Sequence, residues 1–456
     1  MNNRGRKLFK MDPHSTHDLL SAPFMKAVVA NQAGDIYELD GYAAVGMTAG
    51  DFLPLPVAEA IPMPHGGELM RLPERKPVVY NLRTHQMETL VEDPYSPGNP
   101  IYPVAVFNSP GYVITHISAF KAAAKVDPLP LFSYGAVGWH LDGFYSAVIQ
   151  IDTEPRQDLR FMPLDKIHAG VRHMRRRMPK NRLRQHLEDC ALTYGCPAGK
   201  NFFLGRYEAP LPTSQQCNAQ CRGCISLQTD TKICASQDRI SFTPTPEEIA
   251  EVAVTHIENV ERAVVSFGQG CEGDPLFVAK VIGPAIALIR KKTSHGTINM
   301  NTNASRPEIL KKLFDIGLDG IRVSLNSFQP AYYDAYFRPN GYRFADVARS
   351  IELAILQERF VAINYLNYPG FTDTPEELAA LTAFIRQNAI QMIQWRNLNF
   401  DPLHYWQVMS RLRTSSRPMG MRILIKTVQE RFPHLQHGYF NPPREAWPKS
   451  VRTVST

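Results

Sequence analysis

The alternation of strand-like and helix-like segments after about residue 205 is the feature that most constrains the fold. Apolar or β-branched runs recur at a spacing of roughly 25 to 45 residues, with helical stretches between them. Six such runs predict parallel strands joined by right-handed crossovers, so we expect an α/β fold, a partial (β/α)6 barrel of the TIM type. The expected strands are 210–217, 263–270, 297–303, 320–327, 360–370 and 392–399.

Three of the intervening helices have well-marked starts. Thr245, Ser305 and Thr374 each supply a candidate N-cap hydroxyl, followed by Pro and Glu within the first turn. The carboxyl ends of barrel strands meet at one mouth, where barrels of this type carry their chemistry. We therefore expect the polar residues that end these strands to lie together. They are Cys217, Gly268 to Glu272, Asn301 to Asn303, Ser324 to Asn326, Asn367 and Asn399.

The first 150 residues have a different texture. They are rich in Pro and Gly, with short β-branched and aromatic runs between turn signals, which predicts an irregular and mostly antiparallel β region. Residues 163–192 are predicted to be helical, with a break at Met178-Pro179. The predicted domains are 1–204, a β-rich (α+β) domain that ends in this helical segment; 205–403, the barrel; and 404–456, a helical extension and tail.

The composition limits the class of protein. The chain has 456 residues, of which 44% are hydrophobic and 20% charged, so it can bury a large core and is not a disordered protein. No run of about 18 apolar residues occurs, and residues 1–20 lack an apolar signal region, so we expect no membrane segment and a cytoplasmic protein. Seven cysteines, an odd number and few for this length, argue against a disulfide framework and for metal or redox chemistry.

Three of the cysteines lie within eight residues, in the loop that follows the first expected strand. Cys217, Cys221 and Cys224 have the spacing C-x3-C-x2-C. Three thiolates at this spacing can hold three corners of a [4Fe–4S] cubane and leave one iron without a protein ligand. A structural zinc site is the alternative, with Cys234 as the fourth ligand.

The C-x3-C-x2-C loop after a first strand resembles the defining motif of the radical S-adenosylmethionine (radical SAM) superfamily, and the resemblance covers about residues 205–403. Further segments are similar by position, and the resemblance implies that they contact the cofactor. Gly268-Gln269-Gly270-Cys271-Glu272 resembles the Gly-Gly-Glu-Pro segment that meets the methionine amino group. The remaining implied cofactor contacts are Asn301 and Asn303 on the third strand, Ser324 and Asn326 on the fourth, and Asn367 on the fifth.

One position departs from the family pattern. Family members commonly have an aromatic residue just before the third cysteine, near the adenine, and this chain has Gly223. The adenine contacts are then expected from elsewhere, for example from Ile225 or the fifth strand.

The resemblance also implies the chemistry. A [4Fe–4S] cluster and S-adenosylmethionine are the implied cofactors, and a low-potential electron donor of the flavodoxin or ferredoxin kind is the implied partner. Reductive cleavage gives methionine and a 5′-deoxyadenosyl radical, which takes a hydrogen atom from a substrate, so the enzyme is expected to be oxygen-sensitive. The protein orients the reactants and excludes water. Gln394, Arg396 and Asn397 on the last strand are candidate substrate contacts, and hydrogen bonding between loops is the alternative role for each.

The other four cysteines match no compact motif. Cys190, Cys196, Cys234 and Cys271 are either small buried residues or the ligands of an auxiliary cluster. No catalytic residue is identified from the sequence, and Cys271 is a candidate hydrogen donor beside the cofactor.

The net charge of +7 is concentrated in one segment. Between Lys166 and His186 there are eight Lys or Arg residues and no Asp or Glu. The segment is either a solvated helix face or a phosphate-binding surface. The substrate is expected to be a peptide or protein, which is slightly favoured, or RNA. Two other hypotheses remain: a zinc-stabilised nucleic-acid-binding protein and a non-catalytic iron–sulfur protein.

Overall fold

The computed structural model describes residues 23–123, 125–412 and 416–448. The chain divides into two compact units. The first comprises residues up to 107 together with 116–126 and 135–148, and the second comprises 108–115, 127–134 and the residues from 149 onward. The boundary near residue 148 differs from the expected one at 204, because the helices of 163–203 cluster with the barrel. Residues 1–20, where the sequence predicts no signal region, lie outside the described part of the chain.

The first unit is built from antiparallel strands, which confirms the predicted β region. A ten-stranded sheet has the path β12-β7-β2-β1-β13-β14-β5, with β6, β8 and β9 paired beside it, and a three-stranded sheet has the order β11-β3-β4. Alternate residues of β1 and its neighbours face small apolar clusters, for example Val28, Ala30 and Val104. The strands are β1 (Lys26–Ala30), β2 (Ile36–Ala43), β3 (Val45–Thr48), β4 (Asp51–Pro54), β5 (Ile61–Pro62), β6 (Glu68–Arg71), β7 (Arg75–Asn81), β8 (Gln86–Thr89), β9 (Tyr102–Phe107), β11 (Ile117–Ser118), β12 (Phe120–Ala122), β13 (Val137–His140) and β14 (Gly143–Ser146).

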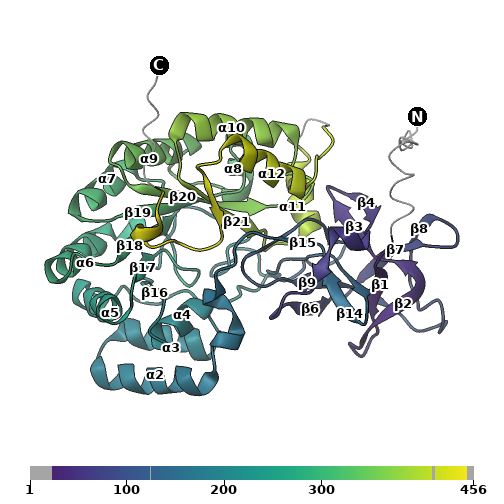
Figure 1. The fold of residues 1–456 in the computed structure, drawn as a ribbon, viewed down its shortest axis with the longest axis horizontal. Helices are drawn as coiled ribbons and strands as arrows, with labels where there is room; N and C mark the ends of the chain where they lie inside the picture. Colours follow the sequence, from purple (N-terminus) through teal and green to yellow (C-terminus); the bar gives the residue numbers. More distant parts are fainter. Residues whose placement is uncertain (1–22, 124, 413–415, 449–456) are drawn as a thin grey trace. The chain divides into compact units, whose positions relative to one another are not determined.

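A curled sheet of seven parallel strands forms the second unit, in sequence order from β16 to β22 (Figure 1). The strands are β16 (Glu208–Pro210), β17 (Val264–Phe267), β18 (Thr297–Thr302), β19 (Gly320–Leu325), β20 (Phe360–Asn367), β21 (Met392–Asn397) and β22 (Gln436–Gly438). The partial barrel predicted from the alternation is therefore confirmed. The seventh strand, β22, was not predicted and lies within the expected C-terminal extension.

Helices cover the outer face of this sheet, as Figure 1 shows for α5, α6, α7, α9 and α10. The helices of the second unit are α2 (Leu164–Arg177), α3 (Arg182–Leu192), α4 (Pro197–Phe203), α5 (Pro246–Asn259), α6 (Ala279–Lys292), α7 (Pro307–Ile316), α8 (Pro330–Phe337), α9 (Phe344–Leu356), α10 (Pro375–Asn388), α11 (Pro402–Met409) and α12 (Met421–Arg431). Two further short strands, β10 (Tyr112–Ile114) and β15 (Val148–Gln150), pair with each other. In the described residues, no helix combines the length and the apolar run that crossing a bilayer requires.

The helix starts at Thr245 and Thr374 are confirmed. Thr245 and Glu248 form a capping box at α5, and the Thr374 hydroxyl accepts from the Glu377 amide at α10. The expected cap at Ser305 is wrong. Helix α7 is preceded by Arg306 without a side-chain cap, because the Ser305 hydroxyl is hydrogen-bonded to Asn218 in the cysteine loop, 3.0 Å away.

The first strand is shorter than predicted. β16 ends at Pro210, and residues 211–217 form a loop instead of continuing the strand. The amides of Thr213 and Ser214 bond to the Glu272 carboxylate rather than to a neighbouring strand. The loop that carries the cysteines therefore begins earlier than the sequence indicated.

Candidate radical SAM site

Cys217, Cys221 and Cys224 lie in the loop after β16, and all three are partly buried. The last turn of α8 holds this loop in place through its backbone carbonyl groups. The Gln220 amide donates to the Phe337 carbonyl, and the Arg222 amide donates to the Tyr336 carbonyl. The Arg222 side chain donates to the Ala335 carbonyl at 2.8 Å.

The sulfurs of the three cysteines are not all close to one another. In the described residues, their sulfurs are not among the groups of ligand atoms that all lie within 4.8 Å of one another. Four ligands of one zinc ion crowd more closely than that, whereas the thiolates of a cubane each bind a different iron. Cys234, the proposed fourth zinc ligand, is exposed. The donor set therefore fits three corners of a [4Fe–4S] cluster better than it fits zinc.

Burial keeps two of these thiols protonated in the absence of metal. It raises the pKa of Cys217 to about 12, and the carboxylate of Asp274 acts in the same direction. The pKa of Cys221 is raised for the same reason, and the two neighbouring thiols add to the effect. Because a bound metal cation favours the thiolate, proton release is expected to accompany cluster loading.

Arg239 is a neighbour of the cysteine loop that the sequence did not single out. Its guanidinium lies 3.6 Å from the Cys224 sulfur and donates to the Gln215 carbonyl and the Ser226 hydroxyl. A cation beside a thiolate stabilises the negative charge of a cluster. Arg239 has no motif to mark it, since it follows the third cysteine by 15 residues.

The missing aromatic residue at Gly223 has a structural explanation. A Cβ at this position would lie 2.7 Å from the Tyr336 hydroxyl and 2.9 Å from the Asn399 carbonyl, so no side chain fits. Tyr336 is buried, and burial is the main cause that raises its pKa, followed by the charge of Cys221. Helix α8 therefore supplies an aromatic ring to the cysteine loop from outside the motif.

The segment after β17 packs directly against the cysteine loop and β18. A Cβ on Gly273 would meet the Gln216 carbonyl at 2.0 Å, and one on Gly268 would meet the Asn301 carbonyl at 1.7 Å. Gly268 also has a φ of +79°, which favours glycine. The two glycines allow three backbone segments to approach one another at the strand ends.

Glu272 fixes this arrangement. One carboxylate oxygen accepts from the amides of Gly268 and Gln269, each at 2.7 Å. The other accepts from the amides of Thr213 and Ser214 and from the Thr213 hydroxyl. Burial raises the pKa of Glu272 to about 7, although these donors favour the ionised form. The carboxylate thus joins the loop after β16 to the loop after β17.

Asp274 has a similar position between β17 and β18 and was not predicted. It is buried and accepts from the Thr302 hydroxyl at 2.9 Å and from the Asn303 amide at 2.7 Å. The Asn303 side chain in turn donates to the Asn218 side chain at 2.8 Å, and the same Nδ2 atom lies 4.0 Å from the Cys217 sulfur. The predicted cofactor residue Asn303 is therefore next to the cysteine loop.

The other predicted cofactor residues lie at the ends of β18 to β20. Asn301 donates to the Gly268 carbonyl, and Asn364 donates to the Ser324 hydroxyl. Three buried amide oxygens in this region have no hydrogen-bond partner. They are Oδ1 of Asn326, Asn364 and Asn367. Unpaired acceptors on neighbouring strand ends suit a ligand that brings hydroxyl or ammonium donors, as S-adenosylmethionine does.

The predicted substrate residues of β21 have different surroundings. Gln394 is buried and bonds to Asn441, Arg322 and Arg396. The Arg396 guanidinium lies 3.6 Å from the centre of the Tyr439 ring. Asn397 instead bonds to the backbone of Tyr112 and Ile114, so its side chain links β21 to β10.

Arg322 and Arg396 make the inner face of the sheet cationic. Burial lowers the pKa of Arg322 to about 9, and the charge of Arg396 acts in the same direction. The Nε atoms of both side chains are buried without a hydrogen-bond partner. The carboxylate of Glu208 acts in the opposite direction on Arg322 and also lies 3.7 Å from Arg156. A pair of guanidinium groups that shares one carboxylate with a third arginine suits an anionic ligand.

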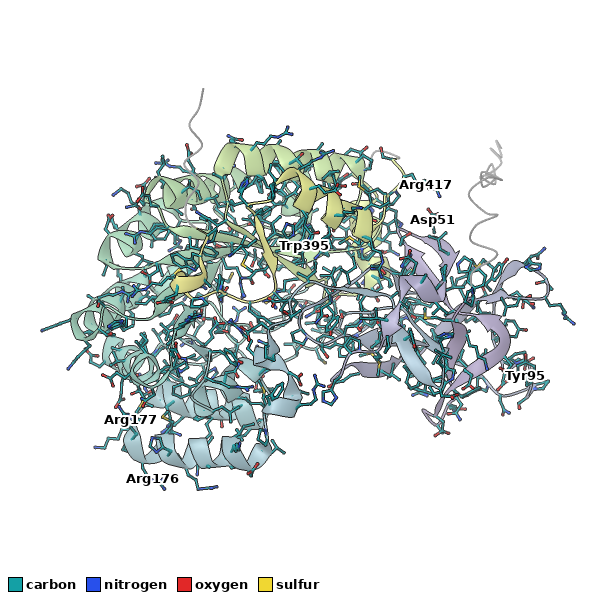
Figure 2. The ribbon with its side chains drawn as sticks, viewed as in Figure 1. Asp51, Tyr95, Arg176, Arg177, Trp395 and Arg417 are labelled. Atoms are coloured by element: carbon teal, nitrogen blue, oxygen red, sulfur yellow. The ribbon has the colours of Figure 1, made fainter. Side chains whose placement is uncertain are left out.

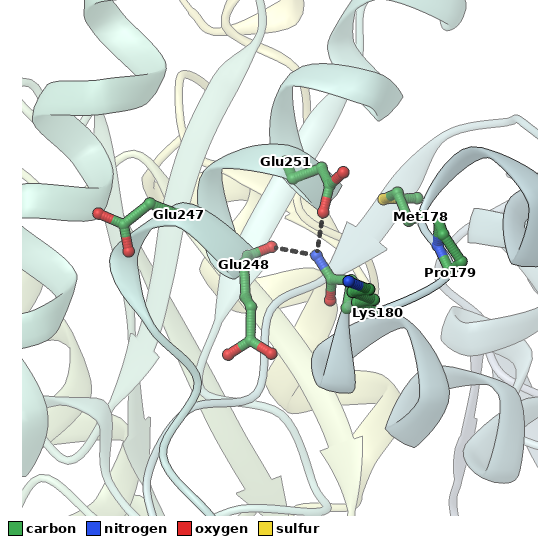
Figure 3. A pocket seen from close by; sticks show the side chains of 7 residues that line it. Met178, Pro179, Lys180, Glu247, Glu248 and Glu251 are labelled. Atoms are coloured by element: carbon green, nitrogen blue, oxygen red, sulfur yellow. Dashed lines mark hydrogen bonds between the residues drawn. The ribbon is translucent and has the colours of Figure 1, made fainter.

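Four of the eight basic residues in the segment 166–186 form ion pairs with acidic residues. Arg175 and Arg184 both bind Glu188, Arg182 binds Glu248, and Arg177 lies 3.6 Å from Glu258. Figure 2 shows Arg176 and Arg177 at the end of α2. A surface hollow lies between the turn that joins α2 to α3 and the start of α5 (Figure 3). It is lined by Met178, Pro179, Lys180, Asn181, Glu247, Glu248 and Glu251, none of them a predicted site residue.

The comparisons with known proteins agree with the cysteine motif and the parallel sheet. Residues 211–382 match the Radical SAM superfamily. Residues 211–382 are therefore a radical SAM domain, and the protein that carries this domain is an enzyme. No curated protein sequence matches the chain.

Three solved structures illustrate the similarity found among known folds. The [FeFe]-hydrogenase maturase HydG from Carboxydothermus hydrogenoformans has 14% identity over 62% of this chain and 70% of its own, with a TM-score of 0.35. Methylornithine synthase PylB has 15% identity over 54% of this chain and 70% of its own, with a TM-score of 0.37. SuiB from Streptococcus suis, solved with the precursor peptide SuiA, has 14% identity over 51% of this chain and 48% of its own, with a TM-score of 0.36.

Proposed function

We propose that this enzyme cleaves S-adenosylmethionine reductively at a [4Fe–4S] cluster held by Cys217, Cys221 and Cys224, and abstracts a hydrogen atom from a substrate at the barrel mouth. The observation that carries the proposal is the C-x3-C-x2-C triplet in the loop after the first strand of a radical SAM domain. When bound, the cluster and S-adenosylmethionine supply the radical. The electron donor is expected to be a low-potential flavodoxin- or ferredoxin-like protein in a reducing, cytoplasmic compartment.

The roles of the chain's own residues follow from their contacts. Glu272 and Asp274 hold the loops after β16, β17 and β18 in register. The unpaired oxygens of Asn326, Asn364 and Asn367 are available to donors of the cofactor. Gly268, Gln269, Gly270, Asn301, Asn303 and Ser324 remain proposed cofactor contacts.

Arg396 is the best-supported substrate contact on β21. Its cationic surroundings, shared with Arg322, favour a carboxylate or another anionic group of the substrate. Gln394 would orient both guanidinium groups, since its side-chain oxygen accepts from each. We place a peptide or protein ahead of RNA as the substrate because four arginines of the basic segment are already paired with carboxylates.

Anaerobic reconstitution tests the proposal. The expected result is a brown protein with about four iron per chain that releases 5′-deoxyadenosine when given a strong reductant and S-adenosylmethionine. Cys221→Ala should abolish both the cluster and the cleavage. Cys234→Ala is the matched control, because Cys234 is exposed and lies outside the triplet, and it should retain both. Stoichiometric zinc on the triplet without cleavage would support the zinc hypothesis, and iron without cleavage the non-catalytic one; either contradicts the proposal.

A further inference from the structure

A second group of potential metal ligands is formed where α3 meets the segment 268–272. His186 and Cys190 are four residues apart on α3 and therefore share one helix face. Cys271 reaches the same point from the loop after β17. The three ligand atoms, one from each residue, all lie within 4.8 Å of one another. This is the only such group of three or more ligand atoms in the described part of the chain.

The distances within this group match those around a single metal ion. The His186 Nε2 atom lies 3.4 Å from the Cys271 sulfur and 3.5 Å from the Cys190 sulfur. Around a tetrahedral zinc ion, with bonds of about 2.3 Å to sulfur and about 2.0 Å to nitrogen, the sulfur and nitrogen ligands lie about 3.5 Å apart. This spacing contrasts with that of the cluster cysteines, whose sulfurs form no such group.

The group is a built site rather than a surface coincidence. Cys190 is 2% exposed and Cys271 is 5% exposed. The edge of the His186 ring faces Phe242 at a centroid distance of 6.4 Å, which orients the imidazole. Two sulfur donors and one imidazole nitrogen form a borderline-soft set that selects zinc over magnesium or calcium.

We propose that His186, Cys190 and Cys271 bind one zinc ion. Cys196 donates its backbone amide to the Cys190 carbonyl but is not part of the close group, so we assign the fourth position to a water molecule. The ion connects α3 to Cys271, which adjoins Glu272. It therefore adds a second attachment to the loop after β17, which the Glu272 hydrogen bonds also hold. This proposal does not depend on the reaction of the triplet.

Metal analysis of the full-length protein, purified without air, tests the site. The expected content is about one zinc per chain, counted separately from iron. Cys190→Ser and His186→Gln should each lose the zinc, whereas Cys234→Ser should keep it. Because the iron of the triplet is measured in the same samples, failure of the zinc site and failure of the cluster are distinguishable.

Cobalt substitution keeps the test valid if a variant does not fold. Wild-type protein stripped of zinc and given Co²⁺ should show the intense visible bands of a tetrahedral ion with a thiolate-to-metal charge-transfer band. Absence of zinc together with absence of these bands overturns the proposal. A Cys190–Cys271 disulfide in the unreduced anaerobic protein also overturns it. So does iron beyond the triplet's cluster that is lost in Cys190→Ser, since that result identifies an auxiliary cluster.

Discussion

The Glu272 carboxylate accepts five hydrogen bonds from the loops after β16 and β17. No sequence motif indicates this role. Glu272→Gln replaces one acceptor oxygen by an amide donor that faces other donors. We expect the free energy of unfolding to fall by about 2 to 5 kcal/mol, because buried N–H groups are left unpaired. Urea denaturation of the wild-type and variant proteins measures the loss.

Glu258→Gln is the control for this substitution. The Glu258 side chain is 55% exposed, and its ion pair with Arg177 spans 3.6 Å, so its loss should change stability by less than about 1 kcal/mol. Equal stability of Glu272→Gln and wild type would show that the carboxylate does not hold the two loops.

The residues of the site differ in how far the sequence could reveal them. The triplet was identified because its spacing has a chemical reason, and the strand-end asparagines were identified from the alternating pattern. Arg239, Asp274 and Tyr336 were missed, since each reaches the cysteine loop from another part of the chain and no spacing connects them. Only folding brings such residues together.

The contact between α3 and α5 carries a prediction at the scale of elements. The Asn181 side chain donates to the Glu248 carbonyl and to the Glu251 carboxylate. Beside it, the Arg182 guanidinium binds the Glu248 carboxylate at 2.7 Å. This hydrogen bond is the largest of the causes that lower the pKa of Glu248 to about 2.

A carboxyl whose pKa is lower in the folded than in the unfolded chain stabilises the fold above its unfolded pKa, and the stabilisation is lost as the pH falls towards the folded pKa. We therefore expect stability to decline between about pH 4.5 and about pH 2. Over this pH range, the free energy of unfolding of Arg182→Ala should fall by about 1 kcal/mol less than that of the wild type. The difference is small because the Arg182 side chain is half exposed.

Chemical denaturation at about pH 5 and about pH 3 measures this effect. Arg172→Ala is the control, because Arg172 is an exposed arginine on the neighbouring helix α2. The same pH dependence in Arg182→Ala and wild type would contradict the assignment of the stabilisation to this ion pair.

Strands and helix starts could be predicted where the local sequence pattern agrees with the packing in the folded protein. The strands β17 to β21 lie within the ranges expected from apolar runs, and two of three capping signals were correct. β22 was missed because Gln436–Gly438 has no β-branched residue and pairs with only one strand, at the edge of the sheet. The Ser305 cap failed because a hydroxyl close to the cysteine loop found a tertiary partner.

At the scale of the second unit, Asn441 joins the two ends of the curled sheet. It follows β22, donates to Glu208 on β16 at 2.8 Å and accepts from Gln394 on β21 at 2.9 Å. Asn441→Ala should lower the free energy of unfolding by about 2 to 4 kcal/mol, since two buried polar partners lose their bonds. The thermal unfolding midpoint reports the loss.

Asn388→Ala is the matched control, because Asn388 is a buried asparagine whose side chain donates to one carbonyl within its own helix. It should cost less than Asn441→Ala. Equal losses would mean that closing the sheet ends contributes nothing beyond the removal of a buried amide.

The way in which the cysteine loop is held also sets an order of events during synthesis. Gln220 and Arg222 bond to residues 335–337, more than a hundred positions further along the chain. A ribosome that has completed the three cysteines has not yet made the backbone that shapes their loop. We therefore expect the proposed cluster to be inserted only after α8 has emerged, because a nascent chain that stalls earlier lacks the carbonyl groups that hold the cysteine loop.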